Sequence, residues 1–276
     1  MRLVIILFSF LIHQLHSQTT LIGSLIDEDT KEPIPFASVG SKQTKAAVLT
    51  NEKGEFKLTL QHANESDSIK FFAIGYFEYT VSIKELNTTK QFKLKASAVS
   101  LDEVQVSAKK LYNKKLGVTN YDKRNCSGFI DLENNWKGVE TAIRLPNSDH
   151  KRLQVKDFSF YIIKNTIKDT LTFRLNFYSS NQYYPTRNIL KKPIIFKTAI
   201  KQGEFKIDLM EYNIIAYDDF YVSVACLMDK VSITDFCFAG ENTEPSYVRE
   251  NAIHKWKKIR GGGAAFNVTV LYSKKD

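Results

Sequence analysis

The chain has 276 residues, of which 43% are hydrophobic and 12% aromatic. This size and composition exclude wholesale disorder and suit one or two domains with packed cores. The formal net charge of +9 at pH 7 indicates either an anionic envelope partner, such as lipid head groups or acidic polysaccharide, or a solvated basic surface without a dedicated partner. Nucleic acid is not expected as a partner, because the N-terminal residues considered next predict an exported protein, and an exported protein rarely meets nucleic acid.

We predict that residues 1–17 are a signal peptide. Arg2 supplies the positive start, residues 3–12 are an apolar run, and the small residue Ser17 precedes the expected cleavage. The run is shorter than the roughly 20 residues that a bilayer requires, and no later segment is apolar enough to span one. No cysteine follows the cleavage site to carry a lipid. We expect a soluble, exported mature chain without a transmembrane segment.

Residues 18–108 form the first predicted domain. Its β-rich runs are bounded by Gly, Pro, Asn or Asp and cover residues 20–27, 55–60, 68–74, 78–83 and 90–95. Phe56, Leu58 and Leu60 alternate with polar residues, so one face of this strand is expected to be buried and the other wet. Gly54 suits a hairpin turn that needs a positive φ. The pattern predicts an antiparallel β-sandwich.

Residues 109–124 are predicted to be a basic linker. Four lysines lie between positions 108 and 117, and the stretch lacks the alternation of a strand. Contact with anionic lipid or glycan and a solvated charge run at a domain junction both agree with this composition.

Residues 125–276 form the second predicted domain. Eight runs are predicted to be strands: 139–145, 153–163, 170–178, 193–200, 204–210, 219–227, 232–239 and 264–272. No amphipathic helix of useful length occurs, and this number of strands suits a jelly-roll-like β-sandwich of two sheets.

The cysteines are Cys126, Cys226 and Cys237, and no Cys-x-x-Cys motif occurs, which excludes zinc-ribbon and thioredoxin-type motifs. Cys226 and Cys237 lie in two adjacent β-rich runs. A hairpin would place their sulfurs opposite each other, as a disulfide in an oxidising compartment. Two buried free thiols are the alternative, because the facing arrangement is lost at a bulge. Cys126 is left over in either case.

Several features mark the first domain in chain order. They are the opening at residues 23–27, Pro33 and Pro35 before residues 36–39, the turn at residues 50–56, the Ile74-Gly-Tyr76 step and the closing Leu101-Asp-Glu-Val104. In these features the domain resembles the carboxypeptidase-regulatory-like, or transthyretin-like, domain of exported Gram-negative envelope proteins. The resemblance implies a transthyretin/Ig-like Greek-key β-sandwich. The expected fold class is therefore all-β, with this sandwich followed by the jelly-roll-like one. It also implies a location in the periplasm, at the outer membrane or on the cell surface.

The same domain precedes the plug of many TonB-dependent receptors. Too little sequence follows Ala108 for a plug and a transmembrane barrel, so we expect no transporter. The second domain is similar to a C-terminal segment that accompanies this domain in short exported proteins, a group without an assigned activity. The matching runs are residues 158–161, 173–178, 207–209, 212–214 and 219–223. The word carboxypeptidase reflects an accessory domain of those enzymes and implies no peptidase here.

No catalytic motif is recognised. A zinc peptidase needs two or three convergent ligands, and the histidines that follow the signal, at positions 62, 150 and 254, lack His-Glu-x-x-His spacing. No Gly-x-Ser-x-Gly elbow occurs. The triple glycine at residues 261–263 precedes a predicted strand, which favours a flexible loop over an anion-binding nest.

The best candidates for a binding site are aromatic and polar residues in or beside predicted loops. They are Trp136, Asn181, Tyr183, Tyr184, Arg187 and Trp256. Flat aromatic rings stack on sugar rings, so these residues would line a glycan site. The alternative is that the aromatic rings cap the ends of the sandwich core.

Two weaker candidate sites involve Asp, Ser and Thr residues. Asp208, Asp218 and Asp219 would join backbone carbonyls around a structural Ca²⁺ ion, the alternative being solvated loop carboxylates. No other cofactor is expected. Ser68 and Thr170 stand in Asp-Ser/Thr-apolar triplets, which resemble the acceptor site of an envelope O-glycosylation system.

The sequence therefore predicts a non-enzymatic exported envelope protein that acts as a binding or scaffolding module, with an envelope protein or a glycan as partner. The alternative is a carbohydrate-binding or weakly carbohydrate-active jelly-roll protein. A peptidase is a third hypothesis and predicts bound zinc.

Overall fold

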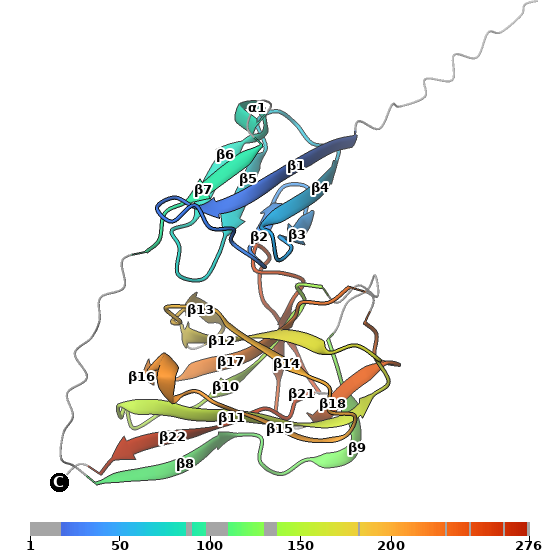
Figure 1. Cartoon of the computed structure of the whole chain (residues 1–276). Helices are drawn as coiled ribbons and strands as arrows, with labels where there is room; N and C mark the ends of the chain where they lie inside the picture. The colour runs from blue at the N-terminus through green and yellow to red at the C-terminus, as the bar shows by residue number, and fades with distance from the viewer. Residues whose placement is uncertain are drawn as a thin grey trace, which may run out of the picture.

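The computed structural model describes residues 18–86, 90–97, 110–129, 137–181, 183–229, 231–242, 244–261 and 263–274. These residues form two β-sandwiches, one above the other in Figure 1. The fold is all-β, as the sequence predicts. None of the described helices is long and apolar enough to cross a membrane. The predicted signal peptide and Trp136 lie outside the described residues.

The first domain packs a three-stranded sheet against a four-stranded sheet. Its elements are β1 (Gln18–Asp27), β2 (Ser38–Ser41), β3 (Ala47–Leu49), β4 (Glu55–Gln61), β5 (Ser68–Phe72), β6 (Tyr79–Ser82), α1 (Ile83–Leu86) and β7 (Gln91–Leu94). The sheet orders are β4–β1–β7 and β3–β2–β5–β6. All neighbours are antiparallel except β1 and β7, which are parallel. The first strand of the domain thus pairs with its last.

The core of the first domain follows the predicted alternation. Phe56, Leu58 and Leu60 on β4 are buried, whereas their polar neighbours are more exposed. Phe71 on β5 stacks on Phe92 of β7 with ring centres 4.6 Å apart, which joins the two sheets. Gly54 has a φ of +73°, and a Cβ there would lie 2.5 Å from the carbonyl oxygen of Leu25, so the turn requires glycine.

The second domain is a larger sandwich. Its first strands are β8 (Leu111–Gly117), β9 (Asp122–Ser127), β10 (Glu140–Leu145), β11 (Leu153–Asn165), β12 (Leu171–Ser180), β13 (Pro185–Asn188), β14 (Ile194–Thr198) and β15 (Gly203–Asp208). A 3₁₀ turn, η1 (Met210–Tyr212), precedes β16 (Ile215–Ala216), β17 (Phe220–Cys226), β18 (Phe236–Glu241), β19 (Ser246–Arg249), β20 (Lys257–Ile259), β21 (Gly263–Ala264) and β22 (Asn267–Ser273).

The chain crosses repeatedly between the two sheets of this domain. A seven-stranded sheet has the order β13–β12–β17–β10–β19–β20, with β14 also on β12. An eight-stranded sheet has the order β21–β18–β11–β22–β8, with β15 and β16 also on β11 and β9 on β18. Strands β10, β11, β12, β15, β17 and β18 alternate between the sheets, as in a jelly roll. Here too the first strand, β8, pairs with the last, β22.

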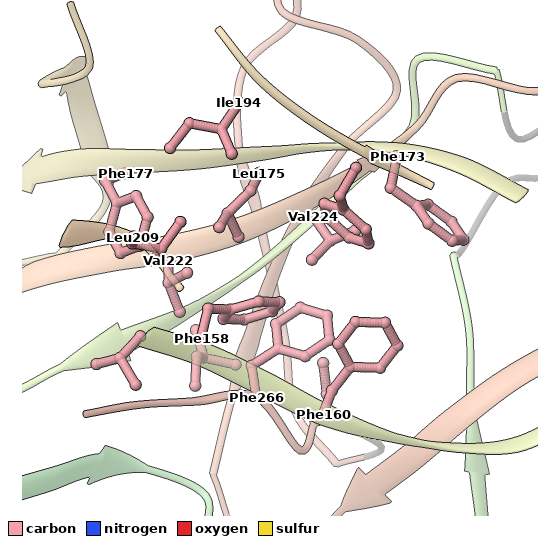
Figure 2. Close-up of a cluster of buried hydrophobic side chains, with 14 of the residues drawn as sticks. Phe158, Phe160, Phe173, Leu175, Phe177, Ile194, Leu209, Val222, Val224 and Phe266 are labelled. Carbon is pink, nitrogen blue, oxygen red and sulfur yellow. The ribbon is translucent and has the colours of Figure 1, made fainter. Parts of the chain in front are cut away.

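Aromatic side chains fill the space between these sheets (Figure 2). Phe173 on β12 meets Phe236 on β18 with ring centres 5.3 Å apart, and Phe196 on β14 meets Phe160 on β11 at 6.3 Å. Each pair joins one sheet to the other. Full burial of such a side chain contributes about 1.5–3 kcal/mol, so the aromatic layer is a main source of stability.

The predicted linker, residues 109–124, is largely part of the second sandwich. Leu111–Gly117 forms β8, which pairs with β22 along its whole length. Leu116 is buried in the core, and Tyr112 lies opposite Tyr272. Lys114 and Lys115, two of the four lysines that suggested a linker, belong to an edge strand, where charge is common because it discourages pairing with other chains. The prediction of a linker was wrong for this part of the stretch.

The disulfide also differs from the expected pair. Cys126 on β9 is bonded to Cys237 on β18, with Cα atoms 5.6 Å apart, and Cys226 is free and buried. Cys226 and Cys237 do not face each other because β17 and β18 lie in opposite sheets and form no hairpin. Cys126 lies opposite Ala239 on the neighbouring strand, which brings its sulfur within reach of Cys237.

The first domain sits on the outer face of the seven-stranded sheet (Figure 1). Arg174 on β12 donates a hydrogen bond from Nη1 to the backbone oxygen of Phe36, at 2.8 Å. Ile74 of the first domain belongs to the same hydrophobic cluster as the second core. A Cβ on Gly75 would lie 2.7 Å from the carbonyl oxygen of Lys191, so the two backbones approach closely at this point. The molecule therefore has stacked layers rather than two independent sandwiches.

Candidate functional site

The outer face of the seven-stranded sheet is the candidate site. Successive side chains along each of its strands point to opposite faces of the sheet. Every second residue, mostly apolar, faces the core, and the residues between them face outward. The outward residues include Glu140 on β10, Tyr178 on β12, Ser223 on β17 and Arg249 on β19, all of which are buried. A sheet face turned away from the core usually holds solvated side chains. Here it holds a charged network beneath further layers of protein.

Glu140 is the centre of this network. Its Oε1 accepts hydrogen bonds from Asn176 Nδ2 at 2.6 Å and Tyr178 OH at 2.8 Å, and from the hydroxyl of Ser223. Its Oε2 accepts from Arg249 Nε at 2.8 Å. Arg249 also donates from Nη2 to the Tyr178 hydroxyl at 2.6 Å. The carboxylate is 0% exposed, and both of its oxygens accept hydrogen bonds.

The arginines decide the charge state of this site. Burial acts against the charged form of Glu140, but Arg249, and after it Arg174, hold the pKa of the carboxyl below its ordinary value. Burial raises the pKa of Tyr178, which stays a neutral hydroxyl. The site is therefore a buried ion pair with hydrogen-bonded support, an arrangement in which loss of one partner is costly.

Arg174 connects this network to the first domain. Burial lowers its pKa, while the charge of Glu140 acts in the opposite direction. Its Nη1 donates a hydrogen bond to the backbone carbonyl of Phe36. Its Nε is buried and has no hydrogen-bond partner among the described residues. The guanidinium of Arg174 thus points toward the first domain, and its positive charge also interacts with the carboxylate of Glu140.

An aromatic cluster continues the site across the same face. The guanidinium of Arg249 lies 4.4 Å from the ring centre of Trp256, which contacts Tyr178 edge-on at 5.6 Å. Tyr247 in the same cluster contacts Tyr184 edge-on at 5.8 Å. Tyr184 lies in the turn between β12 and β13. The cluster therefore extends from the ion pair to an exposed hairpin.

This hairpin holds four of the predicted binding residues. The side chain of Asn181 accepts hydrogen bonds from the backbone amides of Tyr183 and Tyr184 at 3.2 and 2.9 Å, which fixes the turn. Tyr183 is 69% exposed and Tyr184 40% exposed, and Arg187 is exposed on β13. Trp256 is half-buried and reaches them only through the aromatic cluster.

The predicted calcium ligands are not brought together. Asp208 accepts a bond from the Met210 amide at 2.8 Å, and Asp218 lies 2.6 Å from Nδ1 of His150. Asp219 pairs with Arg144. No group of three or more His, Cys, Asp or Glu side chains that would hold a metal occurs in the described part of the chain. These aspartates act as local turn and ion-pair residues, and the predicted site was wrong.

The predicted glycosylation residues lie on different elements. Ser68 is half-buried at the start of β5, opposite Ser82 on β6. Thr170 is exposed immediately before β12. Only Thr170 is readily accessible in the folded chain, and modification at both residues stays a prediction.

Sequence reasoning missed the buried network. Glu140 and Arg249 are charged residues at outward positions of strands, and such residues are usually solvated. Their burial depends on the layer above the sheet, which the pattern within one strand does not report. The only available signal was the occurrence of Glu140 and Asn176 within otherwise apolar runs.

Comparisons with known proteins agree with the reading of the first domain. Residues 21–106 match the family model of the CarboxypepD_reg-like domain, so this part of the chain is such a domain, as its motifs predict. No curated protein matches the chain.

Two of the solved structures that this chain resembles are viral and have low sequence identity to it. A structure of the infectious bursal disease virus Gt strain is 9% identical over 94% of this chain and 60% of that chain, with a TM-score of 0.26. A structure of the Gx strain is 8% identical over 93% and 60%, with a TM-score of 0.25. The chain spans about 60% of the length of these viral chains. Matches of this quality carry no argument about function.

Proposed function

We propose that this protein is a non-catalytic binding or scaffolding module of a Gram-negative cell envelope, with the first domain as a rigid support and the second as the carrier of specificity. The observation that carries the proposal is the buried network of Glu140, Arg249 and Arg174, which ends on the backbone of Phe36 in the first domain. Its charged groups hold layers of protein together. A fixed arrangement of two domains suits a module that displays a surface to a partner.

The same network argues for a structural role of Glu140. A general acid or base must reach the proton of a substrate, directly or through one water molecule. Glu140 is fully buried, accepts bonds from four side chains and is neutralised by Arg249. A carboxylate bound in this way stabilises the fold and has no spare capacity for proton transfer.

The proposal is tested by affinity capture from the protein's own envelope, with residues 18–276 as bait. A defined protein complex with fixed stoichiometry supports a scaffolding role, and recovery of polysaccharide alone contradicts it. An Arg174→Met bait is the informative comparison, because a partner that spans both domains would be lost when their arrangement is loosened. Metal analysis that found stoichiometric zinc would support a peptidase and overturn the non-catalytic role.

Glycan binding is the second candidate function, and the hairpin between β12 and β13 favours it. Two adjacent tyrosines are exposed there on a turn fixed by Asn181, with Arg187 nearby on β13. A glycan array with the Tyr184→Ala variant tests this candidate. Tyr217→Ala is the matched control, because Tyr217 is 57% exposed and lies outside this hairpin. Saturable binding that is lost only in the first variant supports a glycan site.

A further inference from the structure

The free end of the ribbon formed by β8 and β22 is a second surface, on the other sheet from the hairpin between β12 and β13. Tyr112 and Tyr272 lie opposite each other on these strands, with ring centres 5.9 Å apart. The neighbouring strand β11 follows β22 only as far as Leu271, which pairs with Gln154. The last residues of β22 therefore pair only with β8 among the described strands, and this end of the ribbon projects (Figure 1).

Lysine side chains surround the two rings. Nζ of Lys274 lies 4.8 Å and Nζ of Lys110 5.6 Å from the ring centre of Tyr112. Nζ of Lys151 lies 5.8 Å from the ring centre of Tyr272. Amines at this distance from aromatic faces are attracted by the ring electrons. Three lysine amines therefore lie beside the ring pair at this end of the ribbon.

The charge at this end is predominantly positive. Lys114 joins Lys151 and Tyr272 in the lining of a small cavity of about 60 Å³. Asp149, which also lines it, pairs with Lys151 at 2.7 Å. Among the described residues of this surface, Lys110, Lys114, Lys151 and Lys274 thus outnumber the single carboxylate of Asp149. We call this surface the ribbon end and define it by residues Lys110, Leu111, Tyr112, Lys114, Lys151, Tyr272 and Lys274.

We propose that the ribbon end is a contact surface for an anionic lipid bilayer. Basic residues near such a surface are attracted to acidic head groups, and tyrosines favour the boundary between head groups and acyl chains. Leu111 points to the opposite face of β8 from Tyr112, and its side chain is 53% exposed at the tip of the ribbon, so a bilayer met by the tip would contact both faces. The lysines alone would also suit a soluble acidic polymer. The exposed leucine favours the bilayer, because only the bilayer offers an apolar phase to receive it.

Flotation of residues 18–276 with lipid vesicles tests this proposal. We expect binding to vesicles of phosphatidylcholine mixed with phosphatidylglycerol, little binding to phosphatidylcholine alone, and weakening by salt. Each lysine near an anionic surface accounts for about fivefold in affinity, so Lys110→Gln, Lys114→Gln and Lys274→Gln together are expected to lower binding on the order of 100-fold. Circular dichroism checks that the variant is folded.

Two further variants make the result specific. The triple control Lys42→Gln, Lys53→Gln and Lys84→Gln removes the same charge from the first domain and is expected to keep vesicle binding within about twofold, because those lysines lie away from the ribbon end. Leu111→Ser separates lipid from soluble polyanion: it is expected to weaken vesicle binding and leave binding to dextran sulfate unchanged. Equal loss in the control triple, or binding to dextran sulfate without binding to vesicles, overturns the proposal.

Discussion

Arg174 is the residue of the second domain whose guanidinium reaches the backbone oxygen of Phe36, 2.8 Å away in the first. Phe36 has a φ of 54°, in the left-handed region that few non-glycine residues adopt. We expect Arg174→Met to speed amide exchange around Phe36 at least about tenfold, because a hydrogen bond to a charged group contributes about 1.5–3 kcal/mol. Hydrogen exchange with mass spectrometry measures this. Lys197→Met, at an exposed position of β14, is the control. Unchanged exchange around Phe36 in the Arg174 variant would show that the bond does not hold the domains together.

The ion pair below this contact gives a stability prediction. Glu140→Gln leaves Arg249 buried without a counter-charge, and we expect the free energy of unfolding to fall by about 3–5 kcal/mol. Replacement of both Glu140 and Arg249 by methionine is expected to cost less than the single change, because Arg174 is then the one buried charge left in the network, instead of Arg174 and Arg249 together. Urea unfolding followed by fluorescence measures both. Glu204→Gln, at an exposed site on β15, is expected to change stability by less than about 0.5 kcal/mol. A double variant less stable than Glu140→Gln would contradict this account.

Acid should destabilise the protein through two buried carboxylates. The Thr30 amide, against the effect of burial, lowers the pKa of Asp27 below 3.8, and the arginines lower that of Glu140 below 4.5. A carboxyl whose folded pKa is depressed contributes stability above its unfolded pKa and loses it as the pH falls through the folded value. We therefore expect the midpoint temperature of thermal unfolding to decrease once the pH falls below about 4. Asp27→Asn should flatten this dependence, whereas Asp29→Asn, at an exposed position, should not.

The disulfide gives a prediction about thiol chemistry. Cys126 and Cys237 are 111 residues apart in the sequence. In a chain-entropy model, a disulfide that closes a loop of that length contributes up to about 5 kcal/mol to the free energy of unfolding. Cys237→Ser is expected to lower the unfolding free energy by about 2–5 kcal/mol. Cys226→Ala is the control that keeps the bridge.

Alkylation distinguishes the free cysteine from the two disulfide-bonded ones, independently of the stability measurement. Without reductant, iodoacetamide should modify only Cys226, and only after denaturation, because the thiol is buried and burial raises its pKa to about 12. Peptide mapping that found Cys126 or Cys237 alkylated under these conditions would contradict the pairing.

The sequence pattern correctly predicted those features that depend on interactions between residues close together in the chain. The alternation of Phe56, Leu58 and Leu60 gave the face of β4 correctly, and Gly54 marked the turn before it. Tyr183 and Tyr184 were expected in a loop and occupy an exposed turn. Such features depend on neighbours within a few residues, so a single sequence contains them.

Features that depend on distant parts of the chain were not predictable in this way. Cys237 pairs with Cys126 because β9 lies beside β18, although 111 residues separate the two sulfurs. The lysines of β8 suggested a linker because its partner, β22, lies at the other end of the domain. Glu140 is buried only because further layers cover its sheet. These relationships arise from the pairing of strands and domains, which no local pattern encodes.

The pairing of first with last strands has a consequence for how the chain is made. β1 needs β7, and β8 needs β22, so each sandwich lacks a sheet neighbour until the ribosome has completed it. Contacts between such distant segments form slowly. A nascent chain that cannot close early keeps the edges of β1 and β8 without these partners for longer. Loss of the segment from Asn267 onward would leave β8 without its partner and the newly made domain unable to finish folding.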